Sequence, residues 1–287
     1  MRARDDNAPP HRARMPPILY GTAWKKDRTA ALVEQAVRCG FRGIDTACQP
    51  RHYDEPGTGA GIAACLGPAL TREQLYVQTK FTPIDGQDPM RVPYDPDAAL
   101  SDQVAQSFAA SLRNLRTSYL DALILHSPLR HARDQVEVWQ AMERIVDQGG
   151  AHRIGISNCY ERPVLDRLYR SARVKPVIVQ NRFHAPTGYD REIRAYCRDV
   201  GITYQSFWTL TANPQLLAHA TVRTLAATHR RTPAQILFRA LTQAGIVPLT
   251  GTRSPTHMQE DLAIFEFELS ETECAAMAAL YDSESMC

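Results

Sequence analysis

The sequence predicts a (β/α)8 barrel, and three observations support this fold class. Short apolar, β-type runs alternate with amphipathic stretches along the chain, which is the pattern of parallel strands joined by crossover helices. Eight such strands can be counted, and polar or ionisable side chains follow most of them. The chain has 287 residues, slightly more than the roughly 250 of a typical barrel. We therefore predict a single α/β domain.

The expected elements follow one another in regular order. The strands are expected at residues 18–22, 41–45, 75–81, 119–125, 152–157, 176–181, 201–206 and 245–250. The helices are expected at residues 27–39, 57–66, 97–116, 133–148, 161–170, 189–200, 216–229, 233–243, 255–263 and 270–280. Asp27 and Ser270 resemble N-caps, whereas Gly40 and Gly201 resemble helix stops. The segment Pro83 to Pro96 is expected to form a loop above the barrel.

A doubly wound nucleotide-binding sheet is the competing architecture for such an alternation. That fold carries GxGxxG on its first strand-to-helix turn. The nearest candidate, Gly57-Thr58-Gly59-Ala60-Gly61, has a different spacing and follows the second strand. We interpret this segment as the small-residue face of a packed helix.

Composition restricts the function further. Residues 1–16, rich in Arg, Pro and Ala, are expected to be a flexible N-terminal tail, with the barrel domain spanning 17–287. The tail lacks the apolar core of a secretion signal, and no apolar run reaches the ~18 residues of a membrane span. A formal net charge of +2 and the lack of a basic stripe argue against a nucleic-acid partner. Seven scattered cysteines favour the reducing cytoplasm.

In a parallel barrel the carboxyl ends of all strands lie on one face, so the polar groups that follow the strands should converge into a reaction site. The ordered motifs are Gly43-Ile44-Asp45-Thr46-Ala47, Tyr53, Thr79-Lys80, Leu125-His126-Ser127-Pro128 and Gly155-Ile156-Ser157-Asn158. Together these motifs resemble the aldo-keto reductase family, from about Gly21 to Leu280. The resemblance implies a barrel that reduces an aldehyde or ketone to an alcohol with NAD(P)H, and a catalytic tetrad of Asp45, Tyr53, Lys80 and His126.

The chemistry independently requires such a set. Hydride addition to a carbonyl carbon builds negative charge on the oxygen, so a proton donor and an electrostatic partner must meet that oxygen. Tyr53 is the expected donor, Lys80 is expected to lower its pKa, and Asp45 can pair with Lys80. His126 can hold the carbonyl. Each residue taken alone also has a structural interpretation, as a cap, a loop aromatic or a rim residue.

The resemblance also implies a cofactor site. Ser157, Asn158 and Gln180 match positions that bind the nicotinamide carboxamide, and Phe207 matches a tyrosine that stacks on its ring. Thr209 and Leu210 are expected near the pyrophosphate.

The last motif departs from the family pattern. Its residues Thr250, Thr252, Arg253, His257, Glu260 and Asp261 are assigned to the cofactor phosphates and adenine, but His257 stands where the family commonly has Arg, and Asp261 where it has Asn. Arg253 can supply the missing cation, so NADPH is favoured and NADH remains possible. Arg253 can also be a plain helix-start residue.

Substrate contacts are less specified by the sequence. Trp24 matches a pocket position of the family, and Phe81, Trp208 and the tail after Tyr281 are further candidates. No metal-binding motif occurs. We expect a small-molecule carbonyl substrate and a monomer or weak dimer. Two alternatives remain open: a cofactor-binding redox-sensing or regulatory barrel without turnover, and a lyase or aldolase that uses Lys80 as a Schiff base.

Overall fold

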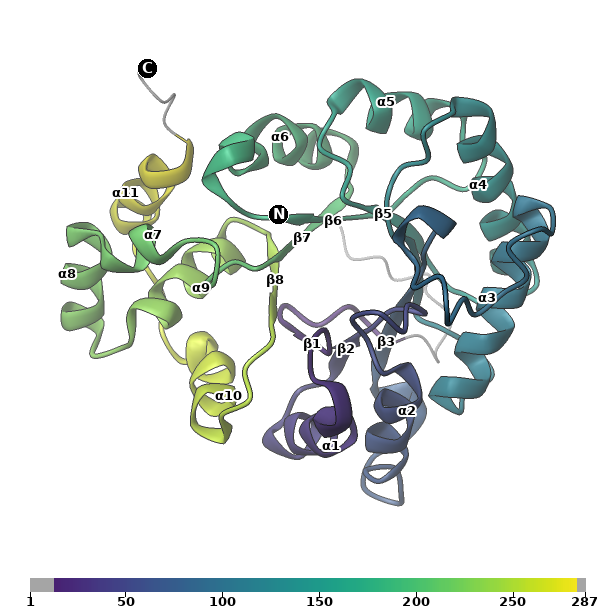
Figure 1. Cartoon of the computed structure of the whole chain (residues 1–287). Coiled ribbons are helices and arrows are strands. Elements are labelled where there is room, and N and C mark those ends of the chain that lie inside the picture. The colour runs from purple at the N-terminus through teal and green to yellow at the C-terminus, as the bar shows by residue number, and fades with distance from the viewer. Residues whose placement is uncertain (1–12, 283–287) are drawn as a thin grey trace.

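The computed structural model describes residues 13–282, and in it eight parallel strands close into a barrel inside a ring of helices (Figure 1). The strands pair in sequence order, and β1 pairs with β8 to close the ring. The strands are β1 Leu19–Gly21, β2 Gly43–Asp45, β3 Tyr76–Phe81, β4 Ala122–Leu125, β5 Ile154–Ser157, β6 Ile178–Arg182, β7 Thr203–Phe207 and β8 Val247–Thr250. The predicted barrel and its eight strands are confirmed.

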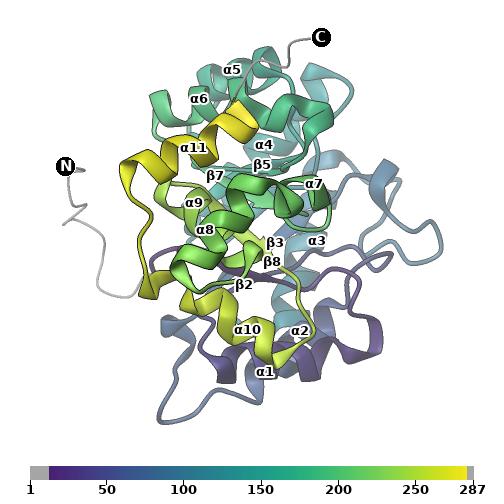
Figure 2. The ribbon, with the colours of Figure 1, turned by 90° about the vertical axis from the view of Figure 1, so that its left-hand side faces the viewer.

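Eleven α-helices lie within residues 13–282, and they cover the outside of the barrel (Figure 1). They are α1 Thr29–Cys39, α2 Glu55–Ala63, α3 Leu100–Leu115, α4 Ala132–Asp147, α5 Arg162–Ser171, α6 Arg191–Val200, α7 Pro214–Ala218, α8 Ala220–His229, α9 Pro233–Gln243, α10 Pro255–Leu262 and α11 Glu271–Asp282. Figure 2 shows α7, α8 and α11 grouped on one side. No helix in this range is long and apolar enough to cross a membrane.

The helix ends follow the predicted chemistry with one exception. Gly40 and Gly201 end α1 and α6 with φ of 121° and 79°, a region that glycine adopts without steric cost. Ser270 caps α11, and its N–H donates to Glu273 Oε2 at 2.8 Å. Asp27 is not an N-cap, because a 3₁₀ turn, Lys26–Arg28, precedes α1 and contains it.

The glycine-rich segment after β2 serves packing, as predicted. A Cβ at Gly59 would lie 2.0 Å from the carbonyl oxygen of Asn114 on α3. A Cβ at Gly61 would lie 2.4 Å from the carbonyl oxygen of Ala30 on α1. The two glycines therefore let α2 approach both neighbouring helices closely.

The lower half of the barrel interior is apolar and closed by the N-terminal segment. Its buried residues are Leu19, Tyr76, Ala122, Ile124, Ile178 and Leu249. Ala13 and Met15 pack against this cluster, and Pro16 lies 3.0 Å from where a Cβ of Gly43 would be. Part of the segment expected to be a flexible tail, namely Ala13, Met15 and Pro16, thus lies against the floor of the barrel. Residues 1–12 of that tail lie outside the described range.

Candidate active site

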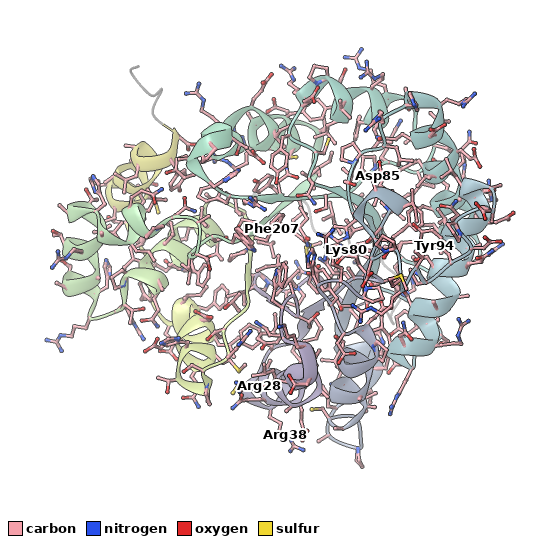
Figure 3. All side chains as sticks on the ribbon, in the orientation of Figure 1. Arg28, Arg38, Lys80, Asp85, Tyr94 and Phe207 are labelled. Carbon is pink, nitrogen blue, oxygen red and sulfur yellow. The ribbon has the colours of Figure 1, made fainter. Side chains whose placement is uncertain are left out.

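The four residues of the expected tetrad meet at the carboxyl ends of β2, β3 and β4. Asp45 is the last residue of β2, and His126 directly follows β4. Lys80 lies on β3 and points into the barrel, since side chains alternate along a strand. Tyr53 comes from the loop between β2 and α2. Figure 3 shows Lys80 inside the ring of strands. The structure thus brings together the residues that the sequence motifs selected.

A buried ion pair forms the base of this site. Lys80 Nζ donates to Asp45 Oδ1 at 2.7 Å and to Oδ2 at 2.8 Å. Its third hydrogen bond goes to the carbonyl oxygen of Thr46 at 2.8 Å. An ammonium has three hydrogens to donate, so all of them are used. Burial lowers the pKa of Lys80, and the Asp45 carboxylate opposes this shift. The geometry therefore fixes Lys80 as a buried cation.

Tyr53 lies above this pair, next to the histidine. Lys80 Nζ is 5.3 Å from the centre of the Tyr53 ring, and the His126 ring centre is 6.0 Å away at an interplanar angle of 70°. Burial, and then the Asp45 carboxylate, raise the pKa of Tyr53. Lys80 was expected to lower this pKa, whereas the direction found is upward, because burial disfavours the charged phenolate. Tyr53 therefore carries its proton at neutral pH.

His126 is uncharged in this setting. Its backbone N–H donates to the Phe81 carbonyl oxygen at 2.8 Å, which fixes the start of the loop after β4. Burial lowers the pKa of His126 to about 3, with further contributions from Lys80 and His52. At pH 7 the imidazole therefore has one N–H donor and one acceptor nitrogen.

A layer of three glutamines surrounds Asp45 beneath the tetrad. Gln78 Nε2 and Gln180 Nε2 donate to Asp45 Oδ1 at 2.7 and 2.9 Å. Both amides also donate to Gln205 Oε1 at 2.8 Å. Gln78 and Gln205 were not singled out from the sequence, although Gln78 precedes Lys80 by two residues and so shares its inward face. The network holds the Asp45 carboxylate in one orientation.

The expected nicotinamide residues lie next to His126. Ser157 ends β5 and Asn158 directly follows it, and the Ser157 hydroxyl donates to the Gln180 carbonyl oxygen at 2.7 Å. Asn158 Nδ2 donates to the His126 carbonyl oxygen at 2.8 Å. Phe207 ends β7 and packs against the apolar cluster inside the barrel (Figure 3). Asn158 and Phe207 are partly exposed, whereas Ser157 and Gln180 are buried, and the Gln180 amide is already bonded to Asp45 and Gln205.

The two residues expected near the pyrophosphate, Thr209 and Leu210, contact other residues of the protein. Thr209 is buried, and its hydroxyl donates to Ser206 Oγ at 2.9 Å. Leu210 is half-buried and packs against the outer core. Their side chains therefore hold the segment after β7 in place.

The side chains of the segment after β8 also form hydrogen bonds within the protein. The Thr250 hydroxyl donates to Asp261 Oδ2 at 2.6 Å, and Thr252 Oγ1 accepts from the backbone N–H of Ser254 at 3.1 Å. Asp261 is buried, and burial raises its pKa to about 6. Its carboxyl points to Thr250, so the expectation that it contacts adenine is not supported.

The remaining residues of the last motif lie at or near the surface of the protein. Arg253 and His257 are exposed, and Glu260 is half-buried. Arg253 Nη2 donates to the Trp24 carbonyl oxygen at 2.6 Å, which ties the segment after β8 to the loop after β1.

Lys25 is a residue that the sequence reasoning missed. It is buried, and its ammonium donates to the Gly251 carbonyl oxygen. Within residues 13–282 no carboxylate forms an ion pair with it, and burial together with Arg253 lowers its pKa to about 8. The signal was the Lys25-Lys26 pair just after the first strand. Among residues 13–282 neither lysine forms an ion pair with a carboxylate, so the pair is a candidate contact for an anionic ligand.

The expected substrate residues fall into two groups. Trp24 and Trp208 are 47% and 44% exposed, with unusual φ of 62° and 56°. Trp24 stacks on His52 at 4.0 Å, and the two form with Tyr53 part of a cavity of about 580 Å³. Phe81 is only 1% exposed and points outward into the core, so it does not line the mouth. The tail after Tyr281 falls almost entirely outside the described residues.

Metal ligands do not cluster here: residues 13–282 contain no group of three or more His, Cys, Asp or Glu that could hold a metal.

An eight-stranded barrel with this constellation at its carboxyl face defines a class of carbonyl-reducing oxidoreductases. The sequence model of the Aldo/keto reductase family matches residues 18–282, and the chain belongs to this family. It is therefore an NAD(P)H-dependent oxidoreductase that reduces carbonyl groups.

Two curated relatives and one crystal structure illustrate the similarity. The chain is 29% identical to glyoxal reductase of Bacillus subtilis, covering 88% of this chain and 83% of the relative. It is 30% identical to a probable NAD(P)H-dependent D-xylose reductase of Aspergillus niger, covering 93% and 90%. An aldo/keto reductase from Brucella melitensis superposes with a TM-score of 0.78 at 26% identity, covering 93% of this chain and 95% of that one.

Proposed function

We propose that Tyr53 donates the proton, His126 orients the carbonyl, and the Lys80–Asp45 pair stabilises developing charge during reduction of an aldehyde or ketone. The single observation that carries this assignment is the closeness of the Tyr53 ring to both Lys80 Nζ, at 5.3 Å, and the His126 ring centre, at 6.0 Å. A nicotinamide cofactor supplies the hydride when bound. The Tyr53 phenol carries its proton at neutral pH, so it can donate that proton as negative charge develops on the carbonyl oxygen.

The surrounding residues supply orientation rather than chemistry. The neutral imidazole of His126 can donate one hydrogen bond to the carbonyl oxygen, on the side away from Lys80. The glutamine layer holds Asp45, and Asp45 holds Lys80, so the positive charge is in place before the reaction. Preorganised charge of this kind costs no rearrangement as negative charge develops on the oxygen.

NADPH is the proposed coenzyme. Ser157, Asn158, Gln180 and Phe207 are the proposed nicotinamide site, and Lys25 with Arg253 would meet the phosphates. The support is that Lys25 and Arg253 lie together between the loops after β1 and β8, and that neither forms an ion pair with a carboxylate within residues 13–282. An exposed guanidinium suits a terminal phosphate, because it can form two parallel hydrogen bonds to it.

The substrate is proposed to be one of many aldehydes or ketones rather than a single compound. Only residues 127–131 separate His126 from α4, so this loop adds little wall to the mouth. Trp24 and Trp208 supply the exposed aromatic surface that remains. Large rigid rings give contact area at a low entropic cost.

The alternative of a Lys80 Schiff base receives no support from the geometry. A nucleophilic amine must lose its proton, whereas Lys80 donates three hydrogen bonds, two of them to a carboxylate. We propose a cytoplasmic location, which suits the six free cysteines found among the described residues. A monomer or weak dimer stays a prediction.

The assignment is tested by Tyr53→Phe. This change removes only the hydroxyl, so we expect kcat to fall by ~100-fold to 10,000-fold, the usual effect of losing a general acid. NADPH affinity, measured by quenching of tryptophan fluorescence, should stay within about twofold of the unmodified protein. An unchanged kcat would show that another group donates the proton.

A further inference from the structure

The histidine of the site has a hydrogen-bond partner that the motifs did not indicate. Thr82 directly follows β3 and lies opposite His126, which directly follows β4. The distance between Thr82 Oγ1 and His126 Nδ1 is 2.6 Å. Thr82 is 2% exposed, so this contact is shielded from water. A short, buried contact of this kind can determine how the imidazole is protonated.

The direction of this hydrogen bond follows from the needs of the hydroxyl. Within residues 13–282, His126 Nδ1 is the only hydrogen-bond partner of Thr82 Oγ1. If the hydroxyl donates, its hydrogen is satisfied by the ring nitrogen. If Nδ1–H donated instead, the buried hydroxyl hydrogen would have no acceptor in this range, which costs roughly 1 to 3 kcal/mol. The hydroxyl is therefore the donor and Nδ1 the acceptor.

We propose that Thr82 is a positioning residue that holds His126 as its Nε2–H tautomer, with that hydrogen free for the carbonyl oxygen of the substrate. This inference rests on the proposed role of His126 at the carbonyl. A neutral imidazole carries one hydrogen, so an acceptor at Nδ1 leaves Nε2 as the donor. No described residue forms a hydrogen bond with Nε2. The opposite tautomer would turn a lone pair toward the carbonyl oxygen and repel it.

Thr82 is itself held by the proline-rich loop. The Tyr94 hydroxyl and Gln87 Nε2 both donate to the Thr82 carbonyl oxygen, at 2.8 and 3.1 Å. Gln87 Nε2 also donates to the Cys48 carbonyl oxygen at 3.1 Å, which joins this loop to the loop that carries Tyr53. Figure 3 shows Tyr94 and Asp85 of this loop on the α3 side of the barrel. The loop thus fixes the backbone from which the hydroxyl reaches His126.

The direct test is the tautomer of His126 in the full-length protein, read by ¹⁵N NMR of histidine-labelled samples at pH 7. The His126 signals are assigned by their loss in His126→Gln. We expect Nε2 to carry the hydrogen in the unmodified protein and in Thr82→Ser. In Thr82→Val, which keeps the branched shape but lacks the hydroxyl, a mixture of tautomers should appear. An Nδ1–H form in the unmodified protein overturns the proposal, whether or not the valine variant folds.

Kinetics supply a second readout. We expect Thr82→Val to lower kcat by roughly 5-fold to 10-fold, the range of one lost hydrogen bond, with NADPH affinity unchanged. Thr82→Ser should recover most of the rate. Equal rates in all three proteins would overturn the link between tautomer and turnover. Full activity in His126→Gln would instead refute the proposed role of His126, while the NMR result for Thr82 would stand.

Discussion

The two halves of the barrel differ in how their polar groups are used. At the ends of β2, β3 and β4, the buried Lys80–Asp45 pair lies next to the Tyr53 phenol, which in turn lies next to the His126 imidazole. At the ends of β7 and β8, hydroxyl groups such as those of Thr209 and Thr250 bond within the protein. The first half therefore gathers ionisable side chains, whereas the hydroxyl groups of the second half are used within the fold.

This difference explains why the two halves tolerate change differently. Proton transfer needs a particular side-chain atom at a particular place. Stacking on a ring face or bonding to backbone groups does not, so Phe207 can stand where the family has tyrosine. Substitutions at the ends of β2, β3 and β4 should therefore affect turnover, and those after β7 and β8 should affect cofactor affinity.

The largest effect is expected for Lys80→Met. This change leaves the Asp45 carboxylate buried without its cation, which costs ~3 to 5 kcal/mol of folding free energy. Turnover should fall below detection. Urea unfolding and NADPH oxidation measure the two effects. The matched control is the double variant Asp45→Asn with Lys80→Met, which should recover most of the stability and none of the activity. Activity in the double variant would contradict the role of Lys80.

Asp261→Asn is expected to stabilise the protein above neutral pH. Burial raises the pKa of folded Asp261 to about 6. The protonated carboxyl therefore contributes stability that is fully present below its unfolded pKa and is lost as pH rises through 6. The loss is roughly 1.4 kcal/mol per unit of pKa difference, or about 2 to 3 kcal/mol. Thermal unfolding should show a gain for Asp261→Asn at pH 7.5 that shrinks toward pH 4.5. A gain independent of pH would exclude this ionisation as its cause.

Arg253→Ala should lower the affinity for NADPH much more than the affinity for NADH. If the Arg253 guanidinium binds the 2′-phosphate, its loss weakens NADPH by roughly 1.5 to 3 kcal/mol and leaves NADH nearly unaffected. Lys25→Met is the comparison, because a cation near the shared pyrophosphate should affect both coenzymes. Fluorescence titration with NADPH and NADH measures all four affinities. Equal losses for both coenzymes in Arg253→Ala would place its contact elsewhere.

The smallest effect is expected for Trp24→Ala. Trp24 is half-exposed on the rim of the cavity beside Tyr53, so its removal should change KM and the ranking of substrates more than coenzyme affinity. Steady-state kinetics over aromatic and aliphatic aldehydes provide the measurement. An unaltered ranking would mean that Trp24 only packs against His52.

The fold and the tetrad were predictable because they depend on local patterns. The order of residues alone shows the apolar strand runs, the helix stops such as Gly40 and the polar residues that end the strands. The glutamine layer and the contact of Thr82 with His126 depend on which side chains face one another across different strands. The sequence also could not predict the raised pKa of Tyr53, because this shift comes from burial and no motif shows how deeply a side chain is buried. Phe81 was misplaced because the one-residue alternation along β3 turns it away from Lys80.

The division of labour between the two halves is tested most directly by single-turnover oxidation of NADPH at saturating coenzyme and substrate. Under these conditions coenzyme affinity no longer affects the rate, so only the chemical step is observed. We predict that Tyr53→Phe slows this step by at least ~100-fold, whereas Arg253→Ala stays within about threefold of the unmodified protein. A fast step in Tyr53→Phe, or equal slowing in both variants, would contradict the account.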